Sequence, residues 1–190
     1  IKMNVISGIY LAYMFIALYM FSFIMILFLK NRKTLLVVPK PSRKYSVSVI
    51  VPAYNEEYSI KGTIEKILEC DYSGLKEIIV VNDGSTDNTL KILRELKRRH
   101  KVLRVINKEN SGKADSINQA LRICSGELIS VIDADSYPES NAIGWMVGFF
   151  NDEKVAAVTS TILVKHRKKI LEKLQAIEYA MIAWPRKLLE

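Results

Sequence analysis

Two aspartates one residue apart, Asp133 and Asp135, are the residues of this chain whose types and spacing point most directly to chemistry. They follow an apolar run, Leu128 to Ile132, which predicts a buried β-strand. Where such a strand ends, both carboxylates can reach one point in space. Carboxylate oxygens in this arrangement suit a hard cation, Mg²⁺ or Mn²⁺, with a diphosphate attached. The pair therefore predicts a metal site at a strand end, where open α/β sheets bind their ligands.

Three earlier polar segments also follow predicted strands. The strands are expected at Val47–Val51, Glu77–Val81 and Val102–Ile106. The polar segments span residues 52–57, 82–87 and 110–115. Turn formation and helix capping would account for one such segment. Several of them at one edge of a parallel sheet converge on a single crevice, which favours a binding site.

The side chains of the first two polar segments suit a nucleoside. Tyr54 can cover a flat base, and Asn55 or Glu56 can hydrogen-bond to polar groups of the nucleoside. Asp83 can accept a hydrogen bond from a ring N–H, such as that of uracil. These two segments therefore predict contacts to the base and its sugar.

The later segments suit a diphosphate. Lys113 can neutralise phosphate as a point charge. A metal held by Asp133 and Asp135 would bridge the diphosphate and stabilise the charge that develops on it as it leaves. The segments together predict a site that binds a nucleoside diphosphate as a leaving group.

Strand and helix patterns alternate along most of the chain. Helical spacing of apolar residues is expected over residues 59–70, 86–99, 114–124, 142–150 and 168–184, and a fifth strand over 155–158. Such alternation predicts an α/β fold with a mostly parallel sheet and helices on both faces.

The N-terminal segment from Val5 to Leu29 is almost continuously apolar. A helix needs about 20 such residues to cross a membrane, whereas a secretory signal has an apolar part of about 7–15 residues and a cleavage site. This run ends in Leu-Lys-Asn-Arg-Lys, so we expect a retained transmembrane helix. Lys2 precedes it and a basic stretch over residues 30–44 follows it. The positive-inside rule therefore places the chain from residue 30 onward in the cytoplasm.

The domain boundaries follow from these patterns. Residues 1–33 are expected to form the membrane anchor with its basic cytoplasmic flank, which can contact anionic membrane lipids. Residues 34–45 contain Pro39 and Pro41 and predict an extended linker. Residues 46–190 are expected to form the α/β domain.

The formal net charge is +8, from 28 Lys and Arg against 20 Asp and Glu. Such a balance attracts anions, including nucleotides, nucleic acid and lipid headgroups. The basic residues flank the apolar helix, however, and no interleaving of aromatic and basic residues is present. We therefore expect no nucleic-acid partner.

Two phosphate- or metal-binding motifs are excluded by two residues each. A Walker A loop at Gly112-Lys113 would need Gly at Asn107 and Ser or Thr at Ala114. An EF-hand at the aspartate pair would need Gly and Glu where Pro138 and Gly144 stand. Neither motif explains these residues.

Two other classes of protein stay open on the residues alone. A phosphatase of the haloacid dehalogenase type also places Asp-x-Asp after a strand, but normally after the first strand, and Tyr137 stands where Thr or Val would be expected. A catalytically inert domain, tethered to the membrane as a scaffold, would also fit the fold.

Three motifs, taken in order, resemble the inverting family 2 glycosyltransferases with the GT-A fold. They are Val-Ile-Val-Pro-Ala-Tyr-Asn-Glu at 49–56, Val-Asn-Asp-Gly-Ser-Thr-Asp-Asn-Thr at 81–89 and Asp-Ala-Asp at 133–135. The resemblance covers roughly residues 46–190. Ser-Gly-Lys-Ala-Asp-Ser-Ile-Asn at 111–118 and Leu-Gln-Ala-Ile-Glu-Tyr at 174–179 are similar to the processive membrane polysaccharide synthases that make hyaluronan, chitin, cellulose or poly-N-acetylglucosamine.

The resemblance implies an activity, a cofactor and a place in the cell. It implies a hexosyltransferase that uses a UDP-sugar donor and Mg²⁺ or Mn²⁺, and that transfers the sugar with inversion to a growing polysaccharide. A lipid-linked acceptor, such as a lipid phosphate carrier, is the alternative. The enzyme would lie in the plasma membrane with its GT-A domain on the cytoplasmic side.

The resemblance also implies roles by position. The residues implied to bind the donor are Pro52, Ala53, Tyr54, Asn55, Glu56, Asp83, Lys113, Asp133 and Ala134. Among them Asp83 would bind uracil and Lys113 would lie near the phosphates. Asp135, together with Asp133, would ligate the metal. Asn82 stands where many relatives have an aspartate.

Three features of the family are missing from the sequence. The catalytic base of the family is a later aspartate in a Thr-Glu-Asp or similar motif, and processive members add a Gln-x-x-Arg-Trp motif and further membrane helices. None of these occurs before Glu190, and the chain begins with Ile1 and ends inside a predicted helix. We therefore expect an N-terminal fragment that holds the donor-binding half, with the base beyond Glu190.

Overall fold

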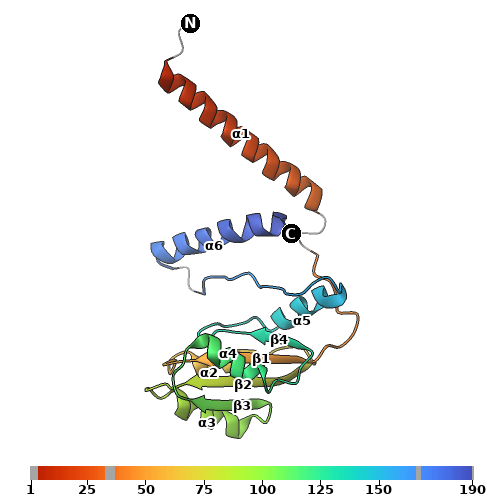
Figure 1. Ribbon diagram of the computed structural model, residues 1–190, viewed down its shortest axis with the longest axis vertical. Coiled ribbons are helices and arrows are strands. Elements are labelled where there is room, and N and C mark those ends of the chain that lie inside the picture. The colour runs from red at the N-terminus through yellow and green to blue at the C-terminus, as the bar shows by residue number, and fades with distance from the viewer. Residues whose placement is uncertain (1–3, 33–36, 166–167, 190) are drawn as a thin grey trace. The chain divides into compact units, whose positions relative to one another are not determined.

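The computed structural model describes residues 4–32, 37–165 and 168–189. The chain divides into two compact units (Figure 1). Residues 39–158 form the α/β unit, and residues 1–38 with 159–190 form the other. The predicted site residues all belong to the α/β unit.

The α/β unit is built on a four-stranded sheet in the order β3-β2-β1-β4, with all strands parallel (Figure 1). The strands are β1 (Val47–Ala53), β2 (Leu75–Asp83), β3 (Leu103–Lys108) and β4 (Leu128–Val131). Val49 of β1 pairs with Ile78 of β2 and with Ser130 of β4. The four carboxyl ends therefore point to one edge, as the sequence predicted.

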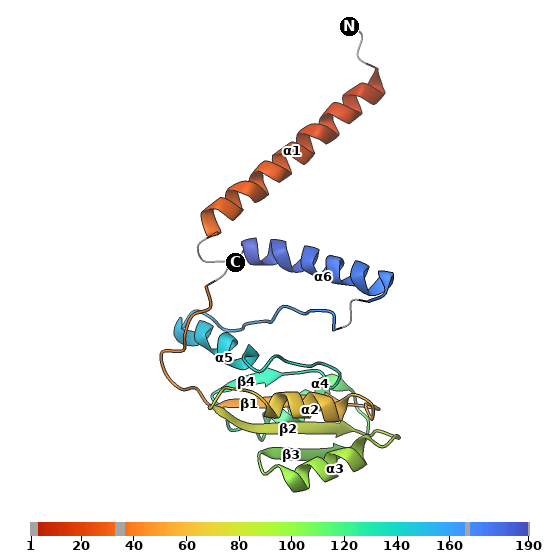
Figure 2. The same ribbon diagram turned by 180° about the vertical axis from the view of Figure 1, so that it is seen from behind.

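Helices cover both faces of this sheet. They are α2 (Ile60–Leu68), α3 (Thr89–Arg99), α4 (Lys113–Leu121) and α5 (Ala142–Val147), with a short 3₁₀ helix, η1 (Gly148–Asn151), after α5. Ile64 of α2 and Leu93 of α3 pack with Val49 on one face, where α2 lies in front of the sheet in Figure 2. Ala120 of α4 packs with Ile50 on the other. Successive residues of β1 pack into the cores on opposite faces of the sheet, because side chains alternate along a strand.

The prediction that β4 is a buried strand was wrong. Ile129 and Val131 are 46% and 47% exposed, and the other two residues of β4 are half-buried. In the part of the chain that the structure describes, β4 pairs only with β1 and is an edge strand. Ile129 and Val131 lie on the face of the sheet that α4 covers. Because α4 packs on β1 and β2, these two side chains of β4 remain exposed.

The fifth strand predicted over residues 155–158 is absent from the structure, which describes this segment as irregular. Ala156 and Ala157 are exposed, and Val155 and Val158 are half-buried. β-branched residues favour a strand only where a neighbouring strand supplies hydrogen bonds and packing. None of the described strands pairs with this segment.

Residues 39–45, which fall within the predicted linker over residues 34–45, belong to the α/β unit and bond to η1. The backbone N–H of Ser42 donates to Asn151 Oδ1 at 2.8 Å, and Asn151 Nδ2 donates to the carbonyl of Lys40 at 2.8 Å. Tyr45 donates through its hydroxyl to the carbonyl of Phe150 at 3.0 Å. Residues 33–36, where the anchor was expected to end, lie outside the described residues.

Among its described residues, the other unit contains two helices, α1 (Val5–Asn31) and α6 (Ile170–Leu189). α1 has 27 residues, none of them buried. At about 1.5 Å per residue it exceeds the roughly 30 Å of a bilayer core. Its length and composition make it a candidate membrane span. α6 confirms the helix predicted over 168–184 and carries exposed apolar side chains at Leu171, Leu174 and Ile177.

Glu77 on β2 gives the fold a pH dependence. Its nearly buried carboxylate binds Arg104 at 2.7 Å and accepts hydrogen bonds from Ser48 and Ser125. Burial alone would raise the pKa of Glu77, but these partners outweigh it and lower the pKa from 4.5 to about 2. The stabilisation is therefore complete above pH 4.5 and is lost as the pH falls through about 2.

Replacing Glu77 with glutamine should therefore destabilise the fold most at neutral pH. The difference in free energy of unfolding between wild type and E77Q should shrink as the pH falls from 4.5 towards 2. Urea unfolding across that range measures it. A difference that is independent of pH would show that the ionised carboxylate contributes nothing.

Candidate functional site

A cavity of about 270 Å³ lies at the carboxyl edge of the sheet. The residues that line it are Pro52, Ala53, Tyr54, Glu56, Asp83, Lys113, Ser116, Asp133, Ala134 and Asp135. The structure thus brings together every predicted donor or metal residue except Asn55. This volume lies just below the roughly 300 Å³ lower end of small-ligand pockets, and the lining combines an aromatic ring with charged groups.

Asn55 lies in the turn after β1, where its φ of 54° is in the left-handed region that asparagine tolerates better than most residues. Its side-chain Oδ1 accepts a hydrogen bond from the backbone N–H of Thr86 at 2.8 Å. Its own N–H donates to Ser85 Oγ at 3.0 Å, and the N–H of Glu56 donates to Thr89 Oγ1 at 2.8 Å. Asn55 therefore joins the loops after β1 and β2, and its predicted contact with the donor has no support from its position.

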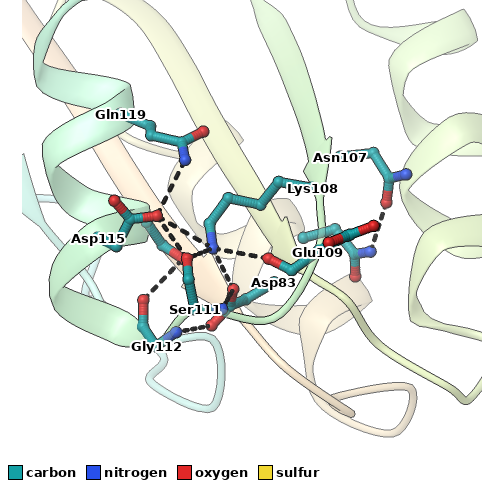
Figure 3. Close-up of polar contacts among 10 residues, drawn as sticks. Asp83, Asn107, Lys108, Glu109, Ser111, Gly112, Asp115 and Gln119 are labelled. Atoms are coloured by element: carbon teal, nitrogen blue, oxygen red, sulfur yellow. Dashed lines mark hydrogen bonds and ion pairs between the residues drawn. The ribbon is translucent and has the colours of Figure 1, made fainter.

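Asp83, the last residue of β2, organises the loop that precedes α4 (Figure 3). Its Oδ1 accepts from the backbone N–H of Ser111 at 2.9 Å and forms an ion pair with Lys108. Its Oδ2 accepts from the N–H of Gly112, also at 2.9 Å. Burial alone would raise the pKa of Asp83, but these donors outweigh it and hold the pKa below its ordinary value. Asp83 is thus an ionised carboxylate at the cavity wall.

The segment of Asp133 and Asp135 is anchored to α2. The carbonyl of Ala134, between them, accepts a hydrogen bond from Thr63 Oγ1 at 2.8 Å in a buried position. Asp133 Oδ1 lies 2.5 Å from Lys113 Nζ, and both side chains are more than half exposed. The hydrogen bond from Thr63 of α2 therefore holds the backbone at Ala134, while the carboxylates of Asp133 and Asp135 stay at the cavity.

These residues fit a divalent cation that arrives with its ligand. No group of three or more His, Cys, Asp and Glu side chains gathers around one point in residues 4–32, 37–165 and 168–189. Asp133 and Asp135 can supply two oxygen ligands, and a diphosphate and water would supply the rest. Lys113 beside them suits the same diphosphate.

Two residues of this region were not predicted, Ser116 and Lys108. Ser116 lines the cavity from α4 and donates through Oγ to the carbonyl of Gly112 at 3.1 Å. Lys108 ends β3, two residues beyond the predicted end of that strand at Ile106. Ile106 packs on the core beneath α4. Side chains two residues apart in a strand point to the same face of the sheet. Extending the predicted strand by two residues would therefore have placed Lys108 on the same face as Ile106.

Comparison with known proteins gives a family match. The sequence matches Glycosyl transferase family 2 over residues 48–187. The poly-beta-1,6-N-acetyl-D-glucosamine synthase of Staphylococcus epidermidis is 34% identical over 151 residues, which cover 79% of this chain and 36% of the relative. The same enzyme from Staphylococcus aureus strain COL is 34% identical over 137 residues, covering 72% and 33%. This chain thus spans about a third of the length of these relatives.

Solved structures show the same fold. A mannosyltransferase from Pyrobaculum calidifontis, in complex with GDP-Man and Mn²⁺, superposes with a TM-score of 0.60 and 31% identity, covering 71% of this chain and 42% of that one. TarS of S. aureus, residues 1–349 in complex with UDP-GlcNAc, gives a TM-score of 0.51 and 28% identity, covering 64% and 38%. The predicted α/β fold of the GT-A type is confirmed.

Proposed function

Because the chain belongs to glycosyl transferase family 2, we propose that it is a membrane-anchored enzyme that transfers a sugar from a UDP-sugar, with inversion, to a growing polysaccharide. The observation that carries the proposal is the cavity at the carboxyl edge of the sheet. An aromatic ring, a lysine and four carboxylates, those of Asp133 and Asp135 among them, line it together. A base, a diphosphate and a divalent metal require groups of these kinds.

Each wall of the cavity has a proposed role. Tyr54 and Glu56 contact the nucleoside, with Asp83 beside them as an acceptor for a base N–H. Lys113 contacts the diphosphate. Asp133 and Asp135 hold Mg²⁺ or Mn²⁺, and the bound metal would stabilise the negative charge of the departing UDP.

The choice of UDP and of a polymer product rests on the relatives. The two curated relatives are synthases of a polymer of N-acetyl-D-glucosamine, and one similar structure contains UDP-GlcNAc. Another similar structure contains GDP-Man, so a guanine donor is the alternative to test. Transfer to a lipid phosphate carrier would use the same donor site and differs only in the acceptor.

The proposed location is the cytoplasmic side of the plasma membrane. α1 is long and apolar enough to span a bilayer, and basic residues follow it while Lys2 alone precedes it. This orientation would place the α/β unit on the cytoplasmic side. A basic flank beside the span would also contact anionic lipid headgroups.

Nucleotide titration into the detergent-purified protein tests the proposal. In the presence of Mn²⁺ we expect UDP to bind at least about tenfold more tightly than GDP, and at least about tenfold more tightly than UDP does with EDTA. Isothermal titration calorimetry measures both ratios. Tighter binding of GDP would overturn the donor assignment, and no binding by folded protein would favour an inert scaffold.

A further inference from the structure

Lys108 is almost withdrawn from solvent, since its side chain is only 9% exposed. Its ammonium group forms an ion pair with Asp83 and a second with Asp115 Oδ2 at 3.3 Å. It also donates to Ser111 Oγ and to the carbonyl of Glu109, the latter at 3.0 Å. A buried ammonium is costly unless partners of this kind surround it, so the site around Lys108 is specifically built.

The partners of Lys108 come from three elements that are separate in the chain (Figure 3). Asp83 ends β2, Ser111 belongs to the loop after β3, and Asp115 lies in the first turn of α4. Ser111 Oγ also contacts Asp115 Oδ2 at 2.5 Å. One cation thus connects the end of a strand to the start of a helix.

The loop held by these contacts leads directly to Lys113, the residue proposed to contact the diphosphate. The N–H groups of Ser111 and Gly112 donate to Asp83, and Gly112 has a φ of +93° that favours glycine. α4 begins at the next residue, Lys113, which lines the cavity. The position of the Lys113 backbone therefore depends on the contacts made by Asp83 and Lys108.

Lys108 also balances charge next to an anion site. Two carboxylates, Asp83 and Asp115, contact it, and a donor diphosphate would add negative charge nearby. Burial would lower the pKa of Lys108, but its two carboxylate partners outweigh it and raise that pKa, so Lys108 is cationic at neutral pH. Without this cation, two adjacent carboxylates would repel each other at the base of the loop.

We propose that Lys108 is a positioning residue of the donor site. Its ammonium group ties Asp83 to Asp115 and so fixes the turn from which Lys113 reaches the diphosphate. Lys108 is absent from the cavity lining and acts only through its partners. The inference rests on the proposed function, because it assigns Lys113 to the donor.

Three variants of the full-length protein in detergent test the inference. Lys108→Met keeps the length of the side chain and removes its charge, and Lys108→Arg keeps the charge. Lys97→Met makes the same exchange at an exposed site on α3 and is the matched control. With Mn²⁺ present, we expect K108M to weaken UDP binding about tenfold or more, K108R to recover most of the loss, and K97M to match wild type.

Amide hydrogen exchange separates this inference from the proposed function. In K108M the amides of Ser111 and Gly112 should exchange at least about tenfold faster than in wild type, because the acceptor that protects them is less well held. This readout needs no nucleotide. If wild type fails to bind UDP, the proposed function fails, and unchanged exchange at these two amides in K108M would overturn the positioning role.

The UDP affinities of K108M and of a second variant, D115N, also test the positioning role of Lys108. Unchanged UDP affinity in K108M, with wild-type affinity intact, would overturn the inference. If K108M does not fold, Asp115→Asn removes the second ion pair at a side chain that is 44% exposed. D115N should fold and should weaken UDP binding several-fold, and wild-type affinity in D115N would overturn the inference.

Discussion

Replacement of Asp135 with asparagine should abolish metal-dependent UDP binding and leave the fold intact. Asp135 is exposed at the cavity, and no hydrogen bond or ion pair to the rest of the described chain holds its carboxylate. The fold therefore loses little when the charge is removed. The proposed metal site, in contrast, loses one of its two protein carboxylates.

The expected loss in UDP affinity is at least about 100-fold, because changing even the outer partners of metal ligands costs about 10–100-fold. Calorimetric titration of UDP into wild type and D135N, with Mn²⁺ and with EDTA, measures it. Glu95→Gln removes one negative charge from an exposed position on α3 and serves as the control. Equal Mn²⁺ dependence in D135N and wild type would show that the metal assignment is wrong.

The type of each helix or strand was predictable where apolar residues kept one regular spacing along the whole element. The β-branched run of β1 and the apolar spacing in α2 gave the correct type of element, with ends that differ by a few residues. The apolar run of β4 gave the strand but the wrong burial. A run of apolar residues does not reveal which neighbours cover it, and α4 packs on β1 and β2 instead.

The candidate site was predictable as a set of loops but not as a network. Parallel strands bring their carboxyl ends together, so the residues after β1, β2 and β4 could be assigned to one cavity from the sequence. The pairing of Asp83 with Lys108 could not. It depends on the register of β2 with β3, in which these two residues are directly paired. Neither periodicity nor residue type specifies that register.

Replacement of Gly84 with alanine should damage both stability and donor binding. Gly84 follows Asp83 and has a φ of +68°, where an L-residue costs about 1–2 kcal/mol. A Cβ at this position would lie 2.6 Å from the backbone nitrogen of Asn110, which cannot move away by side-chain rotation. The loop at Asn110 would have to shift, and the hydrogen bonds of Ser111 and Gly112 to Asp83 would lengthen.

We expect G84A to lower the free energy of unfolding by about 2–4 kcal/mol, since backbone strain and weakened bonds to a charged acceptor act together. UDP affinity should fall about tenfold or more, because the turn that carries Lys113 is displaced. Urea unfolding and UDP titration measure the two effects.

Gly144→Ala is the matched control. Gly144 lies within α5, where alanine favours the helix, and a Cβ there would lie at an ordinary contact distance of 3.7 Å from Tyr72 Cδ2. If G84A retained the stability and UDP affinity of G144A, the close approach of the two loops could not be what positions the donor site. Loss of both properties in G84A alone would show that the backbone contact between Gly84 and Asn110 supports the ion-paired loop and the cavity together.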